Sequence, residues 1–110
     1  MAGKFEFYTD KAGEFRFRLK AGNGETILAS EGYTSKAACS NGIESVQNNC
    51  LDVACFEKTE TEGGKFRFNL KAKNGQVIGV SQNYESEAGR DNGISAVGHA
   101  APAAAVVELA

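Results

Sequence analysis

Three cysteines and one histidine are the residues whose chemistry could make this chain an enzyme. Cys39, Cys50 and Cys55 form no C-x-x-C pair, and His99 is the single histidine. Structural zinc takes four ligands, commonly in closely spaced pairs, and a cysteine nucleophile needs a base and an orienting group beside it. The spacing favours neither site. We therefore expect no catalytic residue, no metal site, no cofactor and reduced thiols.

A second group of candidates consists of basic and aromatic residues along the chain. These possible partner-binding residues are Arg16, Arg18, Lys20, Arg67, Lys71, Tyr33 and Tyr84. Basic side chains beside rings on an open sheet can bind single-stranded nucleic acid by phosphate contact and stacking. Alternatively, the cations pair across strands with Glu6, Glu14 and Glu57, and the tyrosine rings pack on the edge of the core. The residue pattern favours these structural roles and leaves binding roles open.

All of these cations lie in two alternating runs around which the chain is built. The runs are FRFRLKAGNG at 15–24 and FRFNLKAKNG at 66–75. Alternation with period two indicates a half-buried strand, and Asn-Gly favours a type I′ hairpin turn. We expect Phe15, Phe17 and Leu19 to face the core and the basic residues between them to face outward.

The chain repeats itself at an offset of 51 residues, so that Phe15 corresponds to Phe66 and Gly24 to Gly75. Identical residues recur along the whole first copy: Phe5, Glu6, Gly13, Phe15, Arg16, Phe17, Leu19, Lys20, Ala21, Asn23, Gly24, Ile27, Ser30, Tyr33, Ser35, Ala37, Asn41, Gly42, Ile43 and Val46. Strand-like runs at 4–9 and 26–30 flank the central run, and 36–49 follows without alternation. We predict a tandem β-β-β-α duplication in one domain, with repeats at about 4–53 and 54–110.

The segment 36–49 is predicted to be a helix. Its apolar residues form one stripe at helical spacing: Cys39, Ile43, Val46 and Cys50. Thr34 or Ser35 can cap its start. Asn41-Gly42 could form another hairpin turn, but its flanks are not strand-like. Glycine in a helix costs about 1 kcal/mol relative to alanine, so the recurrence of Gly42 as Gly93 predicts a close approach between helix and sheet.

The tail 104–109 is interpreted as a third copy of the opening strand, because Phe56-Glu57 corresponds to Val107-Glu108 at the same offset. Branched valines favour a strand, and Pro102 prevents the helix from continuing. A helical or disordered tail is the alternative. In the strand interpretation such a strand closes each unit, and the middle copy is shared. The fold class is then α+β, with tandem β-β-β-α(-β) repeats forming one antiparallel sheet and two helices on one face.

The repeated pattern F-x-F-x-L-K-A-x-N-G, then I-x-x-S-x-x-Y, then N-G-I-x-x-V, resembles the YegP-like family of small bacterial proteins, catalogued as a domain of unknown function (UPF0339-like). In the first copy it is carried by Phe15, Phe17, Leu19, Lys20, Ala21, Asn23, Gly24, Ile27, Ser30, Tyr33, Asn41, Gly42, Ile43 and Val46. The resemblance implies one sheet built from both repeats and a monomer with internal pseudo-two-fold symmetry. It brings no catalytic residue, cofactor or substrate. The HAAPAAAVVELA ending departs from the polar tail usual in that family.

Charge and hydropathy restrict the function further. The net charge of −2 argues against nucleic acid in general but leaves a local basic patch open. No run of about 18 apolar residues is present, and the start MAGKFEFYTD lacks an apolar leader core. We therefore expect a cytoplasmic, non-enzymatic binding or protein-interaction module whose partner is a protein or small ligand. The alternative is a weak single-stranded nucleic-acid binder using the basic outer face of the sheet.

Overall fold

The structure, a computed structural model, describes residues 3–73 and 75–109. Each repeat contributes three strands and a helix in the predicted order, and a further strand ends the chain. The elements are β1 (Lys4–Thr9), β2 (Phe15–Lys20), β3 (Thr26–Ala29), α1 (Lys36–Asn49), the short 3-10 helix η1 (Val53–Cys55), β4 (Phe56–Glu60), β5 (Phe66–Lys71), β6 (Val77–Val80), α2 (Glu87–Ala100) and β7 (Ala105–Glu108).

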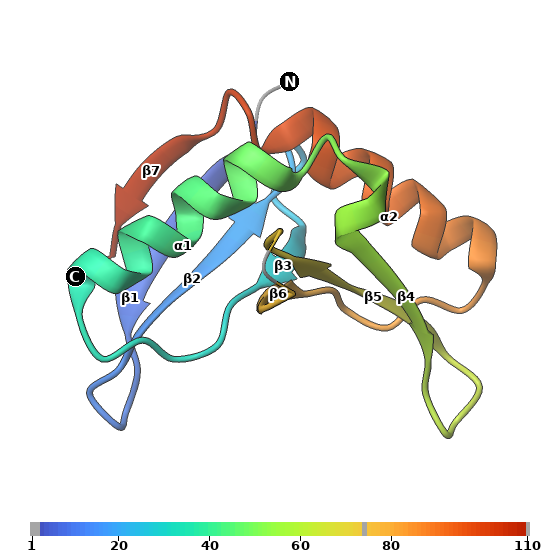
Figure 1. The fold of residues 1–110 in the computed structure, drawn as a ribbon, viewed down its shortest axis with the longest axis horizontal. Helices are drawn as coiled ribbons and strands as arrows, with labels where there is room; N and C mark the ends of the chain where they lie inside the picture. The colour runs from blue at the N-terminus through green and yellow to red at the C-terminus, as the bar shows by residue number, and fades with distance from the viewer. Residues whose placement is uncertain (1–2, 74, 110) are drawn as a thin grey trace.

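A single sheet holds all seven strands in the order β4-β5-β6-β3-β2-β1-β7. The repeats meet at its centre, where Ala29 of β3 pairs antiparallel with Val80 of β6. These two residues correspond at the offset of 51, so the pseudo-two-fold axis passes between them. Figure 1 shows α1 and α2 over the same side of an arched sheet, with the β1–β2 and β4–β5 turns at its two lower ends. The predicted α+β fold of tandem repeats is confirmed.

The two edges of the sheet differ from the prediction. The tail does form a strand, but β7 runs parallel to β1, so the sheet is mixed. The middle strand is not shared either, because β4 pairs with β5 of its own repeat and with no other described strand. After α1 the chain passes directly through η1 into β4, whereas after α2 it crosses to the far edge of the sheet and forms β7.

Both helices pack across the boundary between the repeats. α1 contacts β2 of its own repeat and β5 and β6 of the other, and α2 contacts β5, β2 and β3. The predicted stripe is buried, and so are the inward side chains of the central strands: Cys39, Ile43, Val46, Cys50, Phe17, Leu19, Phe68 and Leu70. Burial of each Phe or Leu contributes about 1.5–3 kcal/mol. Within the described residues, no helix has the length and apolar content to cross a membrane.

Ser35 and Ser86 begin the two helices in the same way. The Ser35 side chain accepts a hydrogen bond from the N–H of Ala38 at 3.1 Å, and Ser86 accepts one from Gly89 at 3.0 Å. A serine oxygen at this position satisfies one of the backbone donors left free in the first turn. Of the two predicted caps for α1, Ser35 is therefore the one used.

The β2–β3 loop is not the predicted type I′ turn. That turn needs positive φ at both central residues, yet no described residue other than glycine has a positive φ, Asn23 included. Instead, Gly24 has φ of 86° and donates its N–H to the carbonyl of Ala21 at 2.9 Å, as in a type I turn closed by a glycine bulge. Asn23 accepts from the N–H of Glu25 at 3.0 Å. Asn74, the corresponding asparagine, lies outside the described residues.

The recurring helix glycines make room for a tyrosine, which gives the predicted close approach its physical cause. A Cβ on Gly42 would overlap the Tyr33 hydroxyl and lie 2.8 Å from its Cζ atom. On Gly93 it would meet Tyr84 in the same way, 2.6 Å from Cζ. Each tyrosine ring also stacks on a core phenylalanine, with Tyr33 and Phe17 centroids 6.2 Å apart.

Candidate functional site

One row of paired residues crosses the side of the sheet opposite α1 and α2, which we call the outer face. From β7 to β4 the row is Val107, Glu6, Arg18, Ala29, Val80, Asn69 and Glu57. Directly paired residues point to the same side of a sheet, so these side chains share the outer face. Small apolar residues, Ala29 and Val80, form its centre, and charged or polar side chains lie on both sides of that centre.

Glu6 gathers three cations on the first-repeat half of the outer face. Its carboxylate accepts a hydrogen bond from Nε of Arg18 at 2.8 Å and lies 3.2 Å from Lys4 Nζ and 3.4 Å from Lys20 Nζ. Only 7% of the Glu6 side chain is exposed. The Arg18 hydrogen bond is the main cause that lowers the pKa of Glu6 to about 2, and burial opposes it. Three positive charges and one negative charge leave this half of the face basic.

The other basic residues predicted to bind a partner lie apart from the cations around Glu6. Arg16 donates from Nε to Asp10 at 2.6 Å, so its carboxylate partner is Asp10 rather than Glu14. In the second repeat, Lys71 Nζ lies 2.9 Å from Glu57. Asn69, in the place of Arg18, donates to the same carboxylate at 3.2 Å. Cross-strand pairing with Glu6 and Glu57 is thus confirmed, and Arg67 is exposed.

Tyr33 and Tyr84 lie away from these cations, on the helix side of the sheet. Backbone pairing with Phe15 and Phe66 places them just beyond the central strands. Burial is the main cause that raises the pKa of both phenols. The Tyr84 hydroxyl is buried and makes no well-formed hydrogen bond to any described residue. The seven candidates therefore do not form one site, and a contact role for the tyrosines stays a prediction.

The cysteines have the surroundings of packing residues. All three are free and buried, and burial raises the pKa of the Cys39 and Cys50 thiols. Cys50 and His99 do line one surface hollow of about 340 Å³. However, the Cys50 thiol donates to the carbonyl oxygen of Gln47 at 3.5 Å and stays protonated at neutral pH. No group of three or more potential metal ligands occurs among the described residues.

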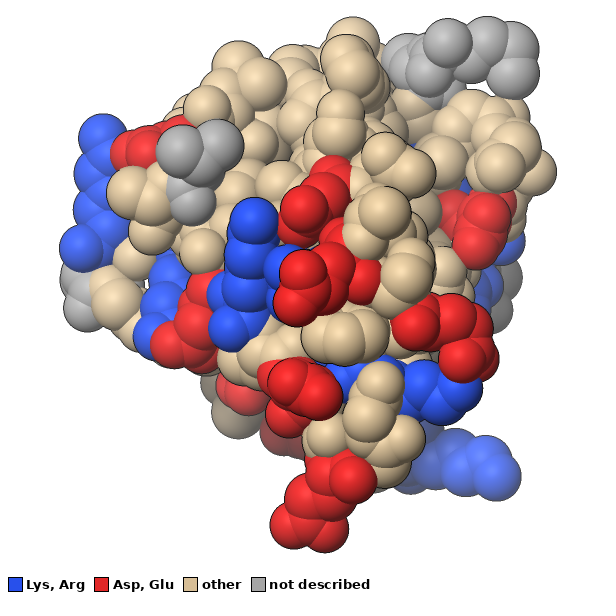
Figure 2. Space-filling view, turned by 90° about the vertical axis from the view of Figure 1, so that its right-hand side faces the viewer, with Lys and Arg blue, Asp and Glu red and all other residues tan. Residues whose placement is uncertain are grey.

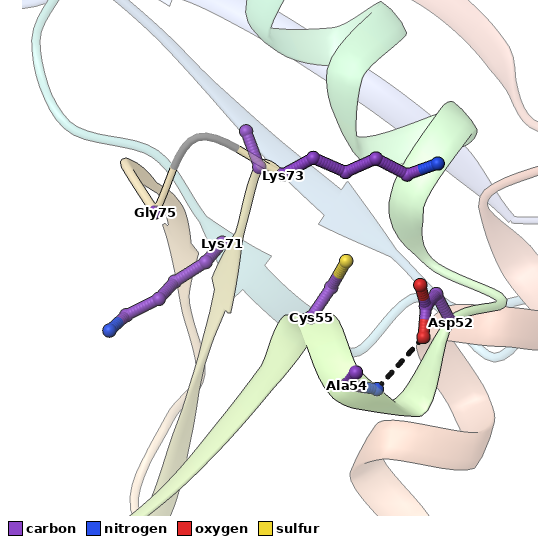
Figure 3. A pocket seen from close by; sticks show the side chains of 7 residues that line it. Asp52, Ala54, Cys55, Lys71, Lys73 and Gly75 are labelled. Carbon is purple, nitrogen blue, oxygen red and sulfur yellow. Dashed lines mark hydrogen bonds between the residues drawn. The ribbon is translucent and has the colours of Figure 1, made fainter.

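A second hollow, of about 310 Å³, lies between η1 and the β5–β6 loop. Figure 3 shows the Cys55 side chain pointing into it, with Lys73 and Asp52 to either side and Lys71 directed away. Asp52 accepts a hydrogen bond from the N–H of Ala54 at 3.0 Å, and the Cys55 thiol lies 3.7 Å from the amide oxygen of Asn49. The hollow thus brings together a thiol, an ammonium and a carboxylate, with no histidine in its lining.

Sequence reasoning missed the central position of Glu6 and the role of Asp10. Glu6 recurs as Glu57 at the offset of 51, and that recurrence is the signal from which a structural role could have been inferred. Reasoning also missed Arg90, which is buried in α2 at the position of Cys39. Its guanidinium lies 5.6 Å from the centre of the Phe66 ring and 3.4 Å from Asp91. The offset of 51 was the available signal, because it places Arg90 at the first position of the buried stripe, where Cys39 stands in the first repeat.

Comparison with known proteins gives two matches to a single family profile, the "Domain of unknown function (DUF1508)", over residues 10–57 and 62–108. A UPF0339 protein encoded in the 5′ region of the ptx operon of Stutzerimonas stutzeri is 60% identical over 109 residues, covering 99% of this chain and 98% of that protein. YegP of Escherichia coli K12 is 52% identical over 97 residues, covering 88% of each chain.

Two solution NMR structures have the same fold. The Escherichia coli YegP structure, described as a protein of unknown function, matches with a TM-score of 0.93 and 47% identity, covering 98% of this chain and 93% of that one. A UPF0339 protein from Shewanella oneidensis matches with a TM-score of 0.93 and 47% identity, covering 99% and 92%. The tandem repeat, the fold and these identities agree, and the chain belongs to the UPF0339 family of YegP-like bacterial proteins.

Proposed function

We propose that this protein is a protein-binding module rather than an enzyme, and that a partner with an acidic surface contacts the outer face of its sheet. One observation carries the proposal: Glu6 holds Lys4, Arg18 and Lys20 beside the apolar centre at Ala29 and Val80. Cations that are already ordered lose less conformational entropy on binding than free side chains do. A small apolar centre bordered by charges is also the usual anatomy of a protein–protein contact.

Single-stranded nucleic acid is the weaker candidate for the same face. Such binding needs aromatic rings on which bases can stack, and Tyr8 is the ring that neighbours these cations. The Arg18 guanidinium lies 5.2 Å from the centre of that ring and already covers it. In the second repeat, Thr59 takes the place of Tyr8, and Lys71 is paired with Glu57.

A site-specific photo-crosslinker tests the proposal. A benzoylphenylalanine at Ala29, on the outer face, should form a discrete adduct in cells of the source bacterium. The same substitution at Ala37, which is exposed on α1, serves as the matched control and should form none. Combining the Ala29 probe with Lys4→Glu and Lys20→Glu should reduce the adduct, because these changes reverse the charge of the face.

Equal adducts from both probes, or no adduct from the Ala29 probe, would contradict the proposal. Fluorescence anisotropy with labelled single-stranded oligonucleotides tests the other candidate. Nucleic-acid binding at low salt that weakens steeply as salt is added would favour that function over protein binding.

A further inference from the structure

The two edge regions of the sheet are built from equivalent residues but are covered differently. At the first edge, β7 lies parallel to β1 and pairs Val106 with Phe5. Its pairing is extended by the N–H of Leu109, which donates to the carbonyl oxygen of Phe7 at 2.8 Å. At the other edge, β4 pairs with β5 alone among the described strands. The outward backbone groups of β4 are therefore available to another strand.

A hollow beside each edge strand shows that the two regions correspond residue by residue. Beside β1, Val106 of β7 faces helix residues Ser40, Ile43, Glu44, Gln47 and Asn48. Beside β4, the hollow of about 340 Å³ is lined by the residues 51 positions later: Asp91, Ile94, Ser95, Gly98 and His99. The floor of that hollow is Phe56, which corresponds to Phe5. The hollow beside β4 therefore lies at the place that corresponds to the position of Val106 beside β1.

The exposure of corresponding side chains differs between the two edges, because a strand covers only one of them. Phe5 is fully buried and Ile43 is 3% exposed, but their counterparts Phe56 and Ile94 are only half-buried. Leu51, at the end of the same hollow, is 73% exposed. Figure 2 views the molecule from this side and shows uncharged surface bordered by acidic and basic side chains. The apolar groups that β7 shields in the first repeat remain open to solvent in the second.

We propose that the groove between β4 and α2 binds an extended segment of a partner protein, which adds to the sheet parallel to β4 as β7 adds to β1. We call this groove the β4 slot and define it by Phe56, Lys58, Asp91, Ile94, Ser95 and Gly98. The proposal is independent of the outer face. In the bound segment, a branched apolar residue lies opposite Phe56 and lines the hollow, as Val106 does opposite Phe5.

Charge identifies the residue two positions later in the segment as basic. At the first edge that position is Glu108, whose carboxylate lies 2.9 Å from Lys36 Nζ. Glu87 takes the place of Lys36 in the second repeat. Asp91 already holds Lys58 at 3.2 Å and Arg90 at 3.4 Å, whereas Glu87 has no ion pair among the described residues. A lysine or arginine of the segment meets Glu87.

The same charges argue against the chain's own tail as the occupant. A second copy would bring Glu108 to the position opposite Lys58, where it would face Glu87. Lys58 is already paired with Asp91 at 3.2 Å, so among the described residues Glu87 is the unpaired charge near Glu108 and repels it. β7 would also have to leave β1, where it shields Phe5. A segment from another protein can have a branched apolar residue followed two positions later by a basic one. Such a segment fits the β4 slot without repulsion from Glu87 and without removing β7 from β1.

Two matched peptides test the proposal. The first is capped AAVVKL, which copies residues 104–109 with lysine in place of Glu108, and the second is capped AAVVEL. Both are titrated into the ¹⁵N-labelled full chain. AAVVKL should shift the amide signals of β4 and of 94–99, and should bind about twofold to fivefold more tightly than AAVVEL, as expected for one exposed ion pair. The Glu87→Lys variant should reverse the preference, and Ile94→Asp should abolish the β4 shifts in a protein whose other signals remain dispersed.

Four results would overturn the proposal. Shifts confined to β1 would mean that the peptide displaces β7. Equal binding of both peptides to the parent chain would contradict the predicted recognition of a basic residue. No β4 shift at millimolar peptide would contradict binding at β4. Concentration-dependent shifts of β4 without any peptide would make a second copy the occupant in place of a partner protein.

Discussion

Glu6 illustrates how a single side chain can order a whole surface. Its carboxylate holds Lys4, Arg18 and Lys20 in fixed positions on the outer face. Among the described residues, Glu57, the equivalent residue, has an ion pair with Lys71 alone, and 46% of its side chain is exposed. The repeat thus provides an internal control, in which the same residue type occupies the same register position with different burial.

We expect Glu6→Gln to destabilise the fold by about 1–3 kcal/mol, because it removes a charged hydrogen-bond acceptor that is almost fully buried. Glu57→Gln, the matched control, should cost much less stability, because exposed ion pairs contribute little. Urea unfolding at pH 7 measures both. Equal losses of stability in the two variants would show that burial does not distinguish these carboxylates.

The pH dependence of stability follows from the same carboxylate. The pKa of Glu6 is lowered from 4.5 to about 2, so the folded state favours the ionised form. The resulting stabilisation is complete above about pH 4.5 and is lost as the pH falls toward 2. The stability gap between the parent and Glu6→Gln should therefore narrow over that range. A ¹³C NMR titration in which Glu6 titrates near its ordinary value would contradict this expectation.

Gly42 is a position where helix propensity and packing oppose each other. Alanine is favoured over glycine in a helix by about 1 kcal/mol. A Cβ at Gly42 would nevertheless overlap the Tyr33 hydroxyl and lie 3.0 Å from Cε2 of Phe17. Overpacking of this kind costs about 1–3 kcal/mol. We expect Gly42→Ala to lower the urea midpoint.

Gly98 in α2 is the matched control for that prediction. A Cβ there would meet nothing closer than the Cys50 carbonyl oxygen at 3.5 Å. Gly98→Ala should raise the urea midpoint, since helix propensity then acts alone. Adding Tyr33→Phe to Gly42→Ala should recover part of the loss, because the hydroxyl is the nearest atom. Two glycine variants that shift the midpoint in the same direction would refute the packing argument.

At the scale of elements, β7 is the covering strand of one edge. Ending the chain after Ala101 removes it and leaves Phe5 and Ile43 beside an open groove. We expect amide hydrogens of β1 to exchange much faster in the truncated chain and its stability to fall, while β4 amides keep their rates. Added AAVVEL peptide should restore β1 protection. Unchanged exchange in β1 would mean that β7 contributes little to the folded state.

Periodicity predicted the elements well because it reports which residues face the core. The alternating run around Phe17 and the helical stripe around Ile43 each have a spacing that only one regular structure can bury on one side. Periodicity does not determine which strand lies next to which. The parallel pairing of β7 with β1 and the open edge of β4 depend on where short connections can reach, and no residue type marks them.

The candidate site was predictable only in part, for a related reason. Alternation placed Arg18 and Lys20 on the outer face correctly. Their convergence on Glu6 depends on the register between β1 and β2, which loop geometry sets. The β2–β3 loop itself differs from the expected type. Tyr33 was separated from the cations because its position after β3 brings it back to the helix side, beside Phe15.

For the whole molecule, the pseudo-two-fold axis creates one crowded position. Leu28 and Gly79 correspond at the offset of 51 and lie against each other near the axis. A Cβ on Gly79 would be 2.7 Å from Leu28 Cγ, and Leu28 is fully buried. The centre therefore holds one large side chain, contributed by one repeat and accommodated by the other.

Exchanging the two residues tests that arrangement. Gly79→Leu alone should cost about 1–3 kcal/mol through overpacking, and Leu28→Gly alone more than about 2.7 kcal/mol through a cavity. The exchanged double variant should regain most of both losses, because the leucine then fills the same space from the opposite side. A double-mutant cycle in urea measures the coupling, and additive losses would count against the symmetry argument.

The packing of each helix over both repeats has a consequence for synthesis. α1 rests on β5 and β6 as well as on β2, so much of the surface that it buries is translated after it. A nascent chain carrying only the first repeat has no partner for the edge of β3, and its helix lacks the contacts with β5 and β6. We therefore expect the two repeats to complete their folding together on the ribosome, because the core beneath both helices closes only after the second repeat has emerged.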